Sequence, residues 1–176
     1  MAAKSGDPLV EDSAVDAYRR SLLPLAELVT PNAFEAARLV GGGGPMDTED
    51  WAEEAAREIV AAFGSAACLV KGIRRGGRVV DVLFDGHATH RFEHDECRDG
   101  GTHGSGCCLS AAVAACFAHG LPRVEAVAHA TDLTHRAIAA GLRTGRGTPV
   151  VNPSAWITPH DVRGRAAAGH GEAGGA

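Results

Sequence analysis

The chain has 176 residues, of which 45% are hydrophobic and 22% charged, and its formal net charge at pH 7 is −5. A chain of this length buries about two-thirds of its unfolded surface when it folds as one domain, so we expect a globular protein. Acidic and basic residues are mixed and form no basic stripe, which argues against a nucleic-acid-binding or membrane-surface protein.

The N-terminal part of the sequence predicts three helices and one short strand. Pro24 ends the first helix, Asp47 is the expected cap of the third, and Gly64 ends that third helix. Four consecutive glycines interrupt the chain after the second helix and predict a flexible break. The predicted helices cover residues 12–23, 33–40 and 48–63, and the strand covers residues 25–30.

Three more strands are predicted in the middle of the chain. A continuous apolar run at 67–71 is typical of a strand that is covered on both faces. The glycine-containing segment 74–78 predicts a hairpin turn into a strand at 79–84, and residues 87–93 predict another strand.

Two helices, at 106–119 and 123–142, follow a glycine-rich loop. The alternation of strands and helices predicts an α/β fold, a three-layer sandwich with a mainly parallel central sheet. We expect one domain over residues 1–160 and a disordered tail over 161–176, because the tail is small, polar and rich in glycine.

The cysteines and the N-terminus bear on the location of the protein. Five cysteines, an odd number without a C-x-x-C pair, predict reduced thiols. The first residues lack the apolar stretch of a signal peptide, and no apolar run approaches the roughly 20 residues of a membrane span. We therefore expect a cytoplasmic protein.

The most informative feature is the loop at 101–108, which leads into an apolar helix. Gly104 and Gly106 allow successive backbone N–H groups to converge, and the unpaired amides of a first helical turn add partial positive charge. Cys107 lies at the mouth of this helix, where a thiolate is stabilised and can act as a base or nucleophile. Cys108 and Cys116 fit the alternative interpretation, small inert hydrophobes in a helix.

Two further features are predicted at the carboxyl ends of strands, where ligands gather in open α/β sheets. Asn32 and Glu35 form the pattern of a capping box, and Glu35 could also hold hydrated Mg²⁺ near a phosphate. Lys71 ends an apolar strand in a chain that otherwise uses arginine, with fifteen arginines to two lysines. A compact ammonium is suited to facing a phosphate as a point charge, although a solvated strand end is the alternative.

A group of histidines raises the alternative of a zinc site. The residues are His87, His90, His94, Cys97 and His103. On an extended strand Cys97 falls on the opposite face from His90 and His94, so the group does not converge without a sharp bend. The spacing and the neighbouring acids favour an exposed hairpin.

Several motifs, in order, resemble the hydroxymethylpyrimidine/phosphomethylpyrimidine kinases of thiamine biosynthesis, within the ribokinase-like superfamily. The resemblance extends from Met1 to about Pro153. The ordered set is specific, whereas a single G-S-G-C is common. The motifs are T-P-N-A-F-E at 30–35, V-K-G at 70–72, D-V-L-F-D-G at 81–86 and T-H-G-S-G-C at 102–107.

The resemblance implies ATP- and Mg²⁺-dependent phosphorylation of 4-amino-5-hydroxymethyl-2-methylpyrimidine and then of its monophosphate. It implies that Gly104, Ser105, Gly106 and Cys107 bind the transferring phosphoryl group, with the Cys107 thiolate as base. Thr102 is implied to lie in the nucleotide site. Asn32 is implied to lie near the nucleotide phosphates, Lys71 to compensate their charge, and Glu35 to orient magnesium through water.

The same resemblance implies that family members carry an additional N-terminal stretch with the first strands of the sheet. We therefore expect an exposed sheet edge and weak or no activity from this chain alone. The stretch could be missing from a fragment, be supplied by a complementing chain or a second copy, or have been lost in a diverged protein. A non-catalytic nucleotide-binding or interaction module and a pyridoxal or pyridoxine kinase are the alternative functions, and a thiol hydrolase lacks an obvious histidine partner for Cys107.

Overall fold

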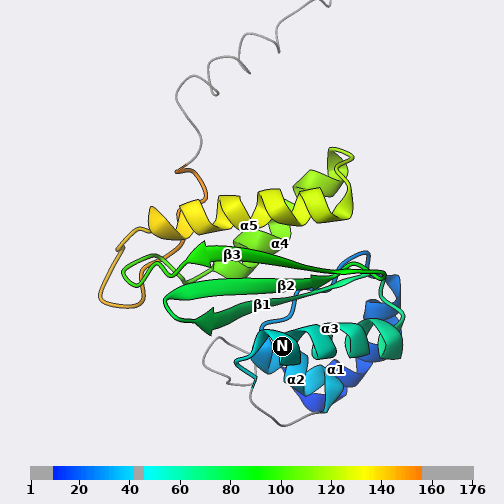
Figure 1. The fold of residues 1–176 in the computed structure, drawn as a ribbon. Helices are drawn as coiled ribbons and strands as arrows, with labels where there is room; N and C mark the ends of the chain where they lie inside the picture. Colours follow the sequence, from blue (N-terminus) through cyan, green and yellow to red (C-terminus); the bar gives the residue numbers. More distant parts are fainter. Residues whose placement is uncertain (1–9, 42–45, 156–176) are drawn as a thin grey trace, which may run out of the picture.

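The computed structural model describes residues 10–41 and 46–155. A three-stranded sheet lies between two layers of helices (Figure 1). The strands are β1 (Cys68–Arg75), β2 (Arg78–Phe84) and β3 (Thr89–Asp95). The α-helices are α1 (Asp12–Ala17), α2 (Ala33–Val40), α3 (Glu49–Phe63), α4 (Ser105–Ala118) and α5 (Arg123–Ala139).

The strands are antiparallel in the order β1–β2–β3, so the prediction of a mainly parallel sheet is not confirmed in the described residues. The reason is the length of the connections, because parallel neighbours need a long crossover whereas Gly76 and Gly77 alone join β1 to β2. Parallel pairing occurs beside β1, where Val29 pairs with Cys68 and Asn32 with Lys71. Within the strand predicted over 25–30, only Val29 forms such a bridge.

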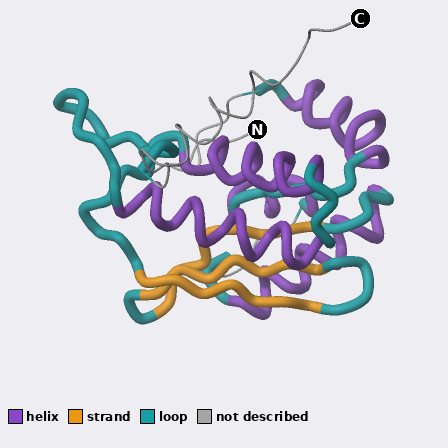
Figure 2. Tube along the Cα trace, turned by 90° about the horizontal axis from the view of Figure 1, so that it is seen from above, coloured by secondary structure: helices purple, strands orange, loops and turns teal. Residues whose placement is uncertain are grey.

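Each face of the sheet has its own core, and both helical layers are seen again from above in Figure 2. On one face, α1, α2 and α3 pack apolar side chains against β1 and β2, among them Ala52, Ala56 and Ile59 of α3, which are fully buried. On the other face, Leu109 and Val113 of α4 and Val127 of α5 pack against Leu69 and Leu83. The predicted α/β fold with helices on both faces is thus observed.

Several predicted element boundaries shift. The helix predicted over 12–23 stops being α-helical at Ala17 and continues as a π-helical turn over Tyr18–Leu22 and a 3-10 turn over Leu23–Leu25. The cap of α3 is Thr48, whose hydroxyl accepts the Trp51 N–H, and not Asp47.

The last predicted strand and helix also shift. The strand predicted at 87–93 begins at Thr89, because the carboxylate of Asp85 accepts the N–H groups of His87 and Ala88 and holds them in a turn. The helix predicted to reach residue 142 ends at Ala139. The predicted tail at 161–176 lies outside the described residues.

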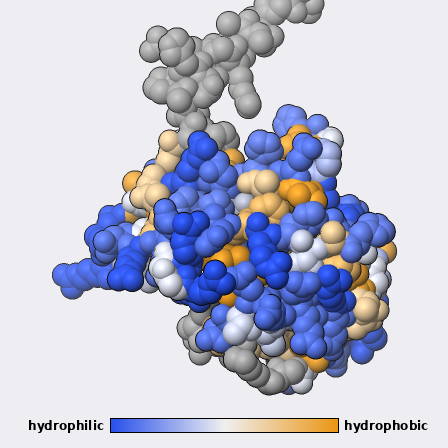
Figure 3. Space-filling view, viewed as in Figure 1, coloured by the Kyte–Doolittle hydropathy of each residue, from blue (hydrophilic) through white to orange (hydrophobic). Residues whose placement is uncertain are grey.

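The surface and the thiols complete the description. The face seen in Figure 3 is mainly hydrophilic, with a few hydrophobic residues visible between the polar ones. All five cysteines are free thiols. Within the described ranges, none of the helices has the length and apolar character needed to cross a bilayer.

Candidate functional site

The three predicted features meet at the end of β1. The backbone N–H of Lys71 donates to the carbonyl of Pro31 at 3.0 Å, which places the segment before α2 directly beside β1. The Lys71 ammonium donates to the carbonyl of Thr30. The structure therefore brings Lys71 and the T-P-N segment into direct contact.

The first turn of α4 closes this group from the other side. A Cβ atom built on Gly106 would lie 3.6 Å from Lys71 Cε and 3.8 Å from Lys71 Nζ, so the lysine side chain passes just beneath that turn. The hydroxyls of Thr30 and Ser110 are 3.1 Å apart and link the segment to the second turn of α4. Lys71 lies between the start of α2 and the start of α4.

The N-terminus of α4 leaves backbone amides for a ligand. Gly104 is the cap residue, with φ of +83° and no side-chain cap, and the first helical bond runs from the Cys108 N–H to the Gly104 carbonyl at 3.0 Å. The carbonyls of Thr102 and His103 already accept from Ser105 and Val151. The amides of Gly106 and Cys107 precede the first helical bond and, with the helix dipole, form a site suited to an anion.

The loop before α4 is held by close backbone packing. The N–H of Gly101 donates to the carbonyl of Ile138 at 2.8 Å. A Cβ atom on Gly101 would lie 1.9 Å from the carbonyl oxygen of Val150. A Cβ atom on Gly141 would lie 2.1 Å from the Gly101 nitrogen. Only glycine fits at these two positions, so the loop before α4 is anchored to the C-terminal end of α5.

The thiol of Cys107 is exposed at this helix start, as a catalytic thiol requires. Cys108 and Cys116 are only partly buried, so their interpretation as buried hydrophobes is correct only in part. Cys68 is the fully buried cysteine, and burial raises the pKa of its thiol. The cysteines of the described residues thus differ sharply in access to solvent.

The capping box predicted at α2 is confirmed. Glu35 N–H donates to Asn32 Oδ1 at 2.9 Å, and Asn32 N–H donates to Glu35 Oε2 at 2.9 Å. Capping does not separate these residues from the site, because the charge of the Glu35 carboxylate acts to raise the pKa of the Lys71 ammonium. Both predicted residues therefore lie at the site while they also stabilise the start of α2.

Charges around Lys71 oppose the effect of its burial. Burial lowers the pKa of the Lys71 ammonium, whereas Glu35, Asp81 and Cys107 act in the opposite direction. Burial raises the pKa of Asp81 to about 6, and the N–H of Gly72 and the charge of Lys71 partly offset this effect. Asp81 had no predicted role, although a single carboxylate between the buried residues Val80 and Val82 was a detectable signal.

The histidines predicted as a zinc alternative take different partners. His90 Nε2 lies 2.7 Å from Asp85 Oδ2, whereas the ring of His94 stacks on that of His135 with 4.8 Å between centroids. Cys97 Sγ lies 3.9 Å from His135 Nδ1. In the part of the chain that the structure describes, no three His, Cys, Asp or Glu residues are arranged to hold a metal ion.

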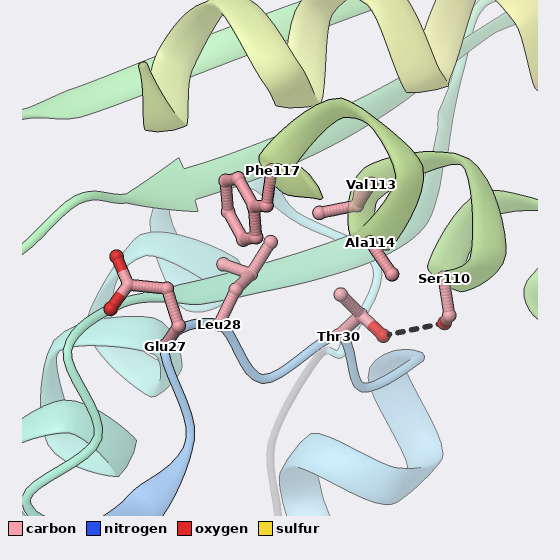
Figure 4. Close-up of a pocket in the computed structure, with 7 residues that line it drawn as sticks. All are labelled: Glu27, Leu28, Thr30, Ser110, Val113, Ala114 and Phe117. Carbon is pink, nitrogen blue, oxygen red and sulfur yellow. Dashed lines mark hydrogen bonds between the residues drawn. The ribbon is translucent and has the colours of Figure 1, made fainter. Parts of the chain in front are cut away.

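An open groove lies beside the site, between the segment before α2 and the exposed side of α4 (Figure 4). Its volume is about 190 Å³. Leu28 and the α4 residues Val113, Ala114 and Phe117 supply apolar walls, and the Thr30–Ser110 pair closes the end nearer Lys71. The groove is an apolar surface and not part of the anion site itself.

Comparisons with known proteins identify the family of this chain. Residues 1–152 match the family described as phosphomethylpyrimidine kinase. A hydroxymethylpyrimidine/phosphomethylpyrimidine kinase from Rhizobium meliloti is 41% identical over 161 residues, which are 89% of this chain and 59% of that protein. The chain thus spans a little more than half of the length of that relative.

Two solved structures share the fold. An ADP complex of Bacillus subtilis pyridoxal kinase has a TM-score of 0.78 and 33% identity, over 84% of this chain and 57% of that one. Phosphomethylpyrimidine kinase from Clostridium difficile has a TM-score of 0.62 and 28% identity, over 80% of this chain and 53% of that one. With the family match over residues 1–152, these similarities show that the chain belongs to the phosphomethylpyrimidine kinase family.

Proposed function

We propose that this chain carries the phosphoryl-transfer site of a hydroxymethylpyrimidine/phosphomethylpyrimidine kinase, with ATP as the donor. The observation that carries the proposal is the position of Lys71 between the capping box of α2 and the open first turn of α4. Phosphoryl transfer requires charge neutralisation, positioning of the phosphates and a proton acceptor, and here a cation, backbone amides and an exposed thiol lie together in one place to supply them.

In the proposed reaction, the hydroxymethyl oxygen of the substrate attacks the terminal phosphorus of ATP. The bond from that phosphorus to the bridging oxygen breaks, ADP leaves, and the hydroxyl proton passes to the Cys107 thiolate. The amides of Gly106 and Cys107, with the turn formed by Gly104 and Ser105, hold the oxygens of the transferring group. In the second transfer an oxygen of the monophosphate attacks the terminal phosphorus of another ATP, the bond to the bridging oxygen breaks, and ADP leaves.

Lys71 neutralises charge that develops on the phosphates, and Asn32 and Thr102 lie beside them. Glu35 and Asn32 offer carboxylate and amide oxygens, the donors that Mg²⁺ prefers, so the residues fit a magnesium ion that Glu35 holds through water. Such an ion would supply charge neutralisation on the phosphate oxygens.

Pyridoxal is the alternative acceptor, because the Bacillus subtilis structure that shares this fold is a pyridoxal kinase. The family match and the 41% identical relative favour the pyrimidine. Competition between hydroxymethylpyrimidine and pyridoxal for the same phosphoryl donor separates the two, since the preferred acceptor suppresses transfer to the other.

The groove of Figure 4 is proposed to receive the remaining part of the kinase domain. The backbones of Val29 and Pro31 bond to β1, so in this extended segment the backbone of Leu28 points to the opposite edge. An extended apolar strand would pair with this edge and cover Phe117 and Ala114. The Rhizobium meliloti relative has such additional length, because 41% of it lies outside the match.

A binding titration tests the proposed function in this chain. ATP, with and without Mg²⁺, is titrated into the wild type, Lys71→Met and the control Arg74→Met. Arg74 lies on the same strand as Lys71 and pairs with Glu96, so the control removes an equal charge from that strand. We expect ATP binding that weakens about tenfold or more in Lys71→Met alone, because a charge-assisted phosphate contact is lost. No binding by the wild type, or equal loss in both variants, would refute the proposal.

A product assay distinguishes a kinase from a non-catalytic binding module. Phosphorylation of hydroxymethylpyrimidine is measured for this chain alone and mixed with the N-terminal part of the Rhizobium meliloti relative. We expect weak or no turnover alone and a clear gain in the mixture. Light scattering shows whether a second copy covers the groove instead, in which case the chain alone is a dimer.

A further inference from the structure

A carboxylate that the proposed mechanism does not use lies behind Lys71. The strands β1 and β2 pair regularly up to Val70 and Val82 and resume at Ile73 and Val80. Lys71 and Gly72 therefore stand opposite Asp81 alone, which is the arrangement of a β-bulge. The bulge lies at the position from which Lys71 reaches the site.

Asp81 holds the bulge through its side chain. The N–H of Gly72 donates to Asp81 Oδ1 at 2.7 Å, and Gly72 has φ of +85°, a conformation that other residues rarely adopt. In a regular ladder that N–H would have a backbone partner on β2. The carboxylate replaces this partner and fixes the direction in which the chain leaves Lys71.

Asp81 also acts on Lys71 by charge. The Lys71 side chain is partly buried against the Thr30 carbonyl and the first turn of α4, where a cation is costly without a nearby anion. Asp81 and Glu35 are the carboxylates that favour its protonated form. Glu35 is in addition part of the capping box, whereas the Asp81 carboxylate accepts its hydrogen bond from Gly72 of the bulge.

We propose that Asp81 is a positioning residue for the phosphate site, which aims Lys71 at the start of α4 and keeps it cationic. The proposal rests on the proposed function, since Lys71 is the group that meets the phosphate. The pKa of Asp81 is raised to about 6, so keeping this carboxylate ionised at neutral pH costs free energy of folding. A carboxylate that lowers stability in this place supports a role in the site.

The test uses the full chain and three variants. Asp81→Asn keeps an oxygen that can accept the Gly72 N–H but removes the charge, and Asp81→Ala removes both. Asp85→Asn is the matched control, because Asp85 follows the same strand but serves the turn at His87 and Ala88. Circular dichroism and chemical denaturation confirm that each variant is folded.

The first readout is the reactivity of the Lys71 amine, which does not depend on nucleotide binding. The chain has only two lysines, so acetylation of Lys71 is followed by mass spectrometry with Lys4 as the internal reference. In Asp81→Asn we expect Lys71 to react up to about ten times faster, as a fall of one pKa unit increases the neutral amine tenfold. An unchanged rate would overturn the proposal.

The second readout is ATP affinity at pH 7.5. We expect a loss of about fivefold in Asp81→Asn, a larger loss in Asp81→Ala and none in Asp85→Asn, in the range of a single charge contact. Wild-type affinity in Asp81→Asn would overturn the positioning role. If the wild type bound no ATP, the proposed function would fail, whereas the acetylation rates would still decide whether Asp81 controls Lys71.

Discussion

Two helix N-termini face Lys71, and they are built in opposite ways. At α2, the side chain of Asn32 caps the Glu35 amide and the side chain of Glu35 caps the Asn32 amide. At α4, Gly104 provides no side chain, and the amides of Gly106 and Cys107 precede the first helical bond. One helix start satisfies its own donors, and the other leaves them for a ligand.

The difference shows how a small site separates stability from binding. A capped start stabilises its helix by about 1 kcal/mol and is suited to holding side chains in place. An uncapped start gives up that stabilisation and keeps its donors and dipole for an anion. The contrast predicts that substitutions at α2 mainly change folding, whereas substitutions at α4 mainly change ligand binding and chemistry.

The largest effect is expected at the open helix start. Cys107→Ala should lower turnover about 10²- to 10³-fold, because the transferred proton loses its acceptor, while ATP affinity changes little. Turnover is measured as phosphate transferred to hydroxymethylpyrimidine in the mixture with the complementing fragment. Cys116→Ala, near the other end of α4, is the control. Equal turnover in Cys107→Ala and the wild type would remove the base from the mechanism.

The second prediction concerns the charge between the two helix starts. Asp81 has a pKa of about 6 in the folded state, above its ordinary value of 3.8, so the folded state takes up a proton more readily than the unfolded state. Wild-type stability should therefore rise relative to Asp81→Asn as pH falls from 7 to 4, by about 2 kcal/mol. Urea denaturation at several pH values measures this difference.

Asp85 gives the matched comparison of opposite sign. The N–H groups of Ala88 and His87 lower the pKa of Asp85, so its stabilising effect is present above the unfolded pKa and lost as pH falls. The stability of the wild type relative to Asp85→Asn should thus shrink in acid. The same slope for both variants would contradict the assigned environments.

The third prediction concerns the backbone conformation of Gly104 at the open helix start. Gly104→Ala places a side chain at φ of +83°, where its Cβ would lie 3.3 Å from Val151 Cγ1. We expect a loss of about 1 kcal/mol in stability and roughly tenfold weaker ATP binding, because the amides turn away. Gly120→Ala, with φ of +79° and open space around it, should lose stability alone. Weaker ATP binding in both variants would mean that the effect is not local.

The smallest effect is expected at the capped helix start. Asn32→Ala should lose about 1 kcal/mol of stability through the lost cap, as should Thr48→Ala at the start of α3. Asn32→Ser keeps a capping oxygen and should retain most of that stability. A drop of ATP affinity in Asn32→Ser would show that Asn32 also reaches the nucleotide, as proposed, whereas unchanged affinity would limit it to capping.

Local sequence signals predicted the parts of the fold that depend on neighbouring residues. The bounds of α2 and its capping box follow from Asn32 and Glu35, and the turn at Gly76 and Gly77 follows from residues that adopt tight turns. The loop at 101–108 and Lys71 were identified because glycine, cysteine and a rare lysine stand at predicted strand and helix ends.

What the sequence did not predict depends on contacts between distant segments. The hairpin predicted at 74–78 implied one antiparallel pair, but the mainly parallel sheet is not confirmed among the described strands, because periodicity does not distinguish parallel from antiparallel neighbours. Asp81 had no assigned role, since its partner Gly72 is nine residues away and the bulge that joins them is a property of two paired strands. The π-helical turn after α1 had no recognisable signal either.

The packing of Gly101 against Val150 and Gly141 has a consequence for how a nucleotide would be recognised. Because there is no room for a side chain at this crossing, the backbone of the loop packs directly against Val150 and Gly141 and is held there without a ligand. Ordering a flexible segment on association usually reduces affinity, and a preorganised loop avoids that entropic penalty. The close packing that holds the loop before α4 therefore depends on Gly101 and Gly141, which lie outside the anion site itself.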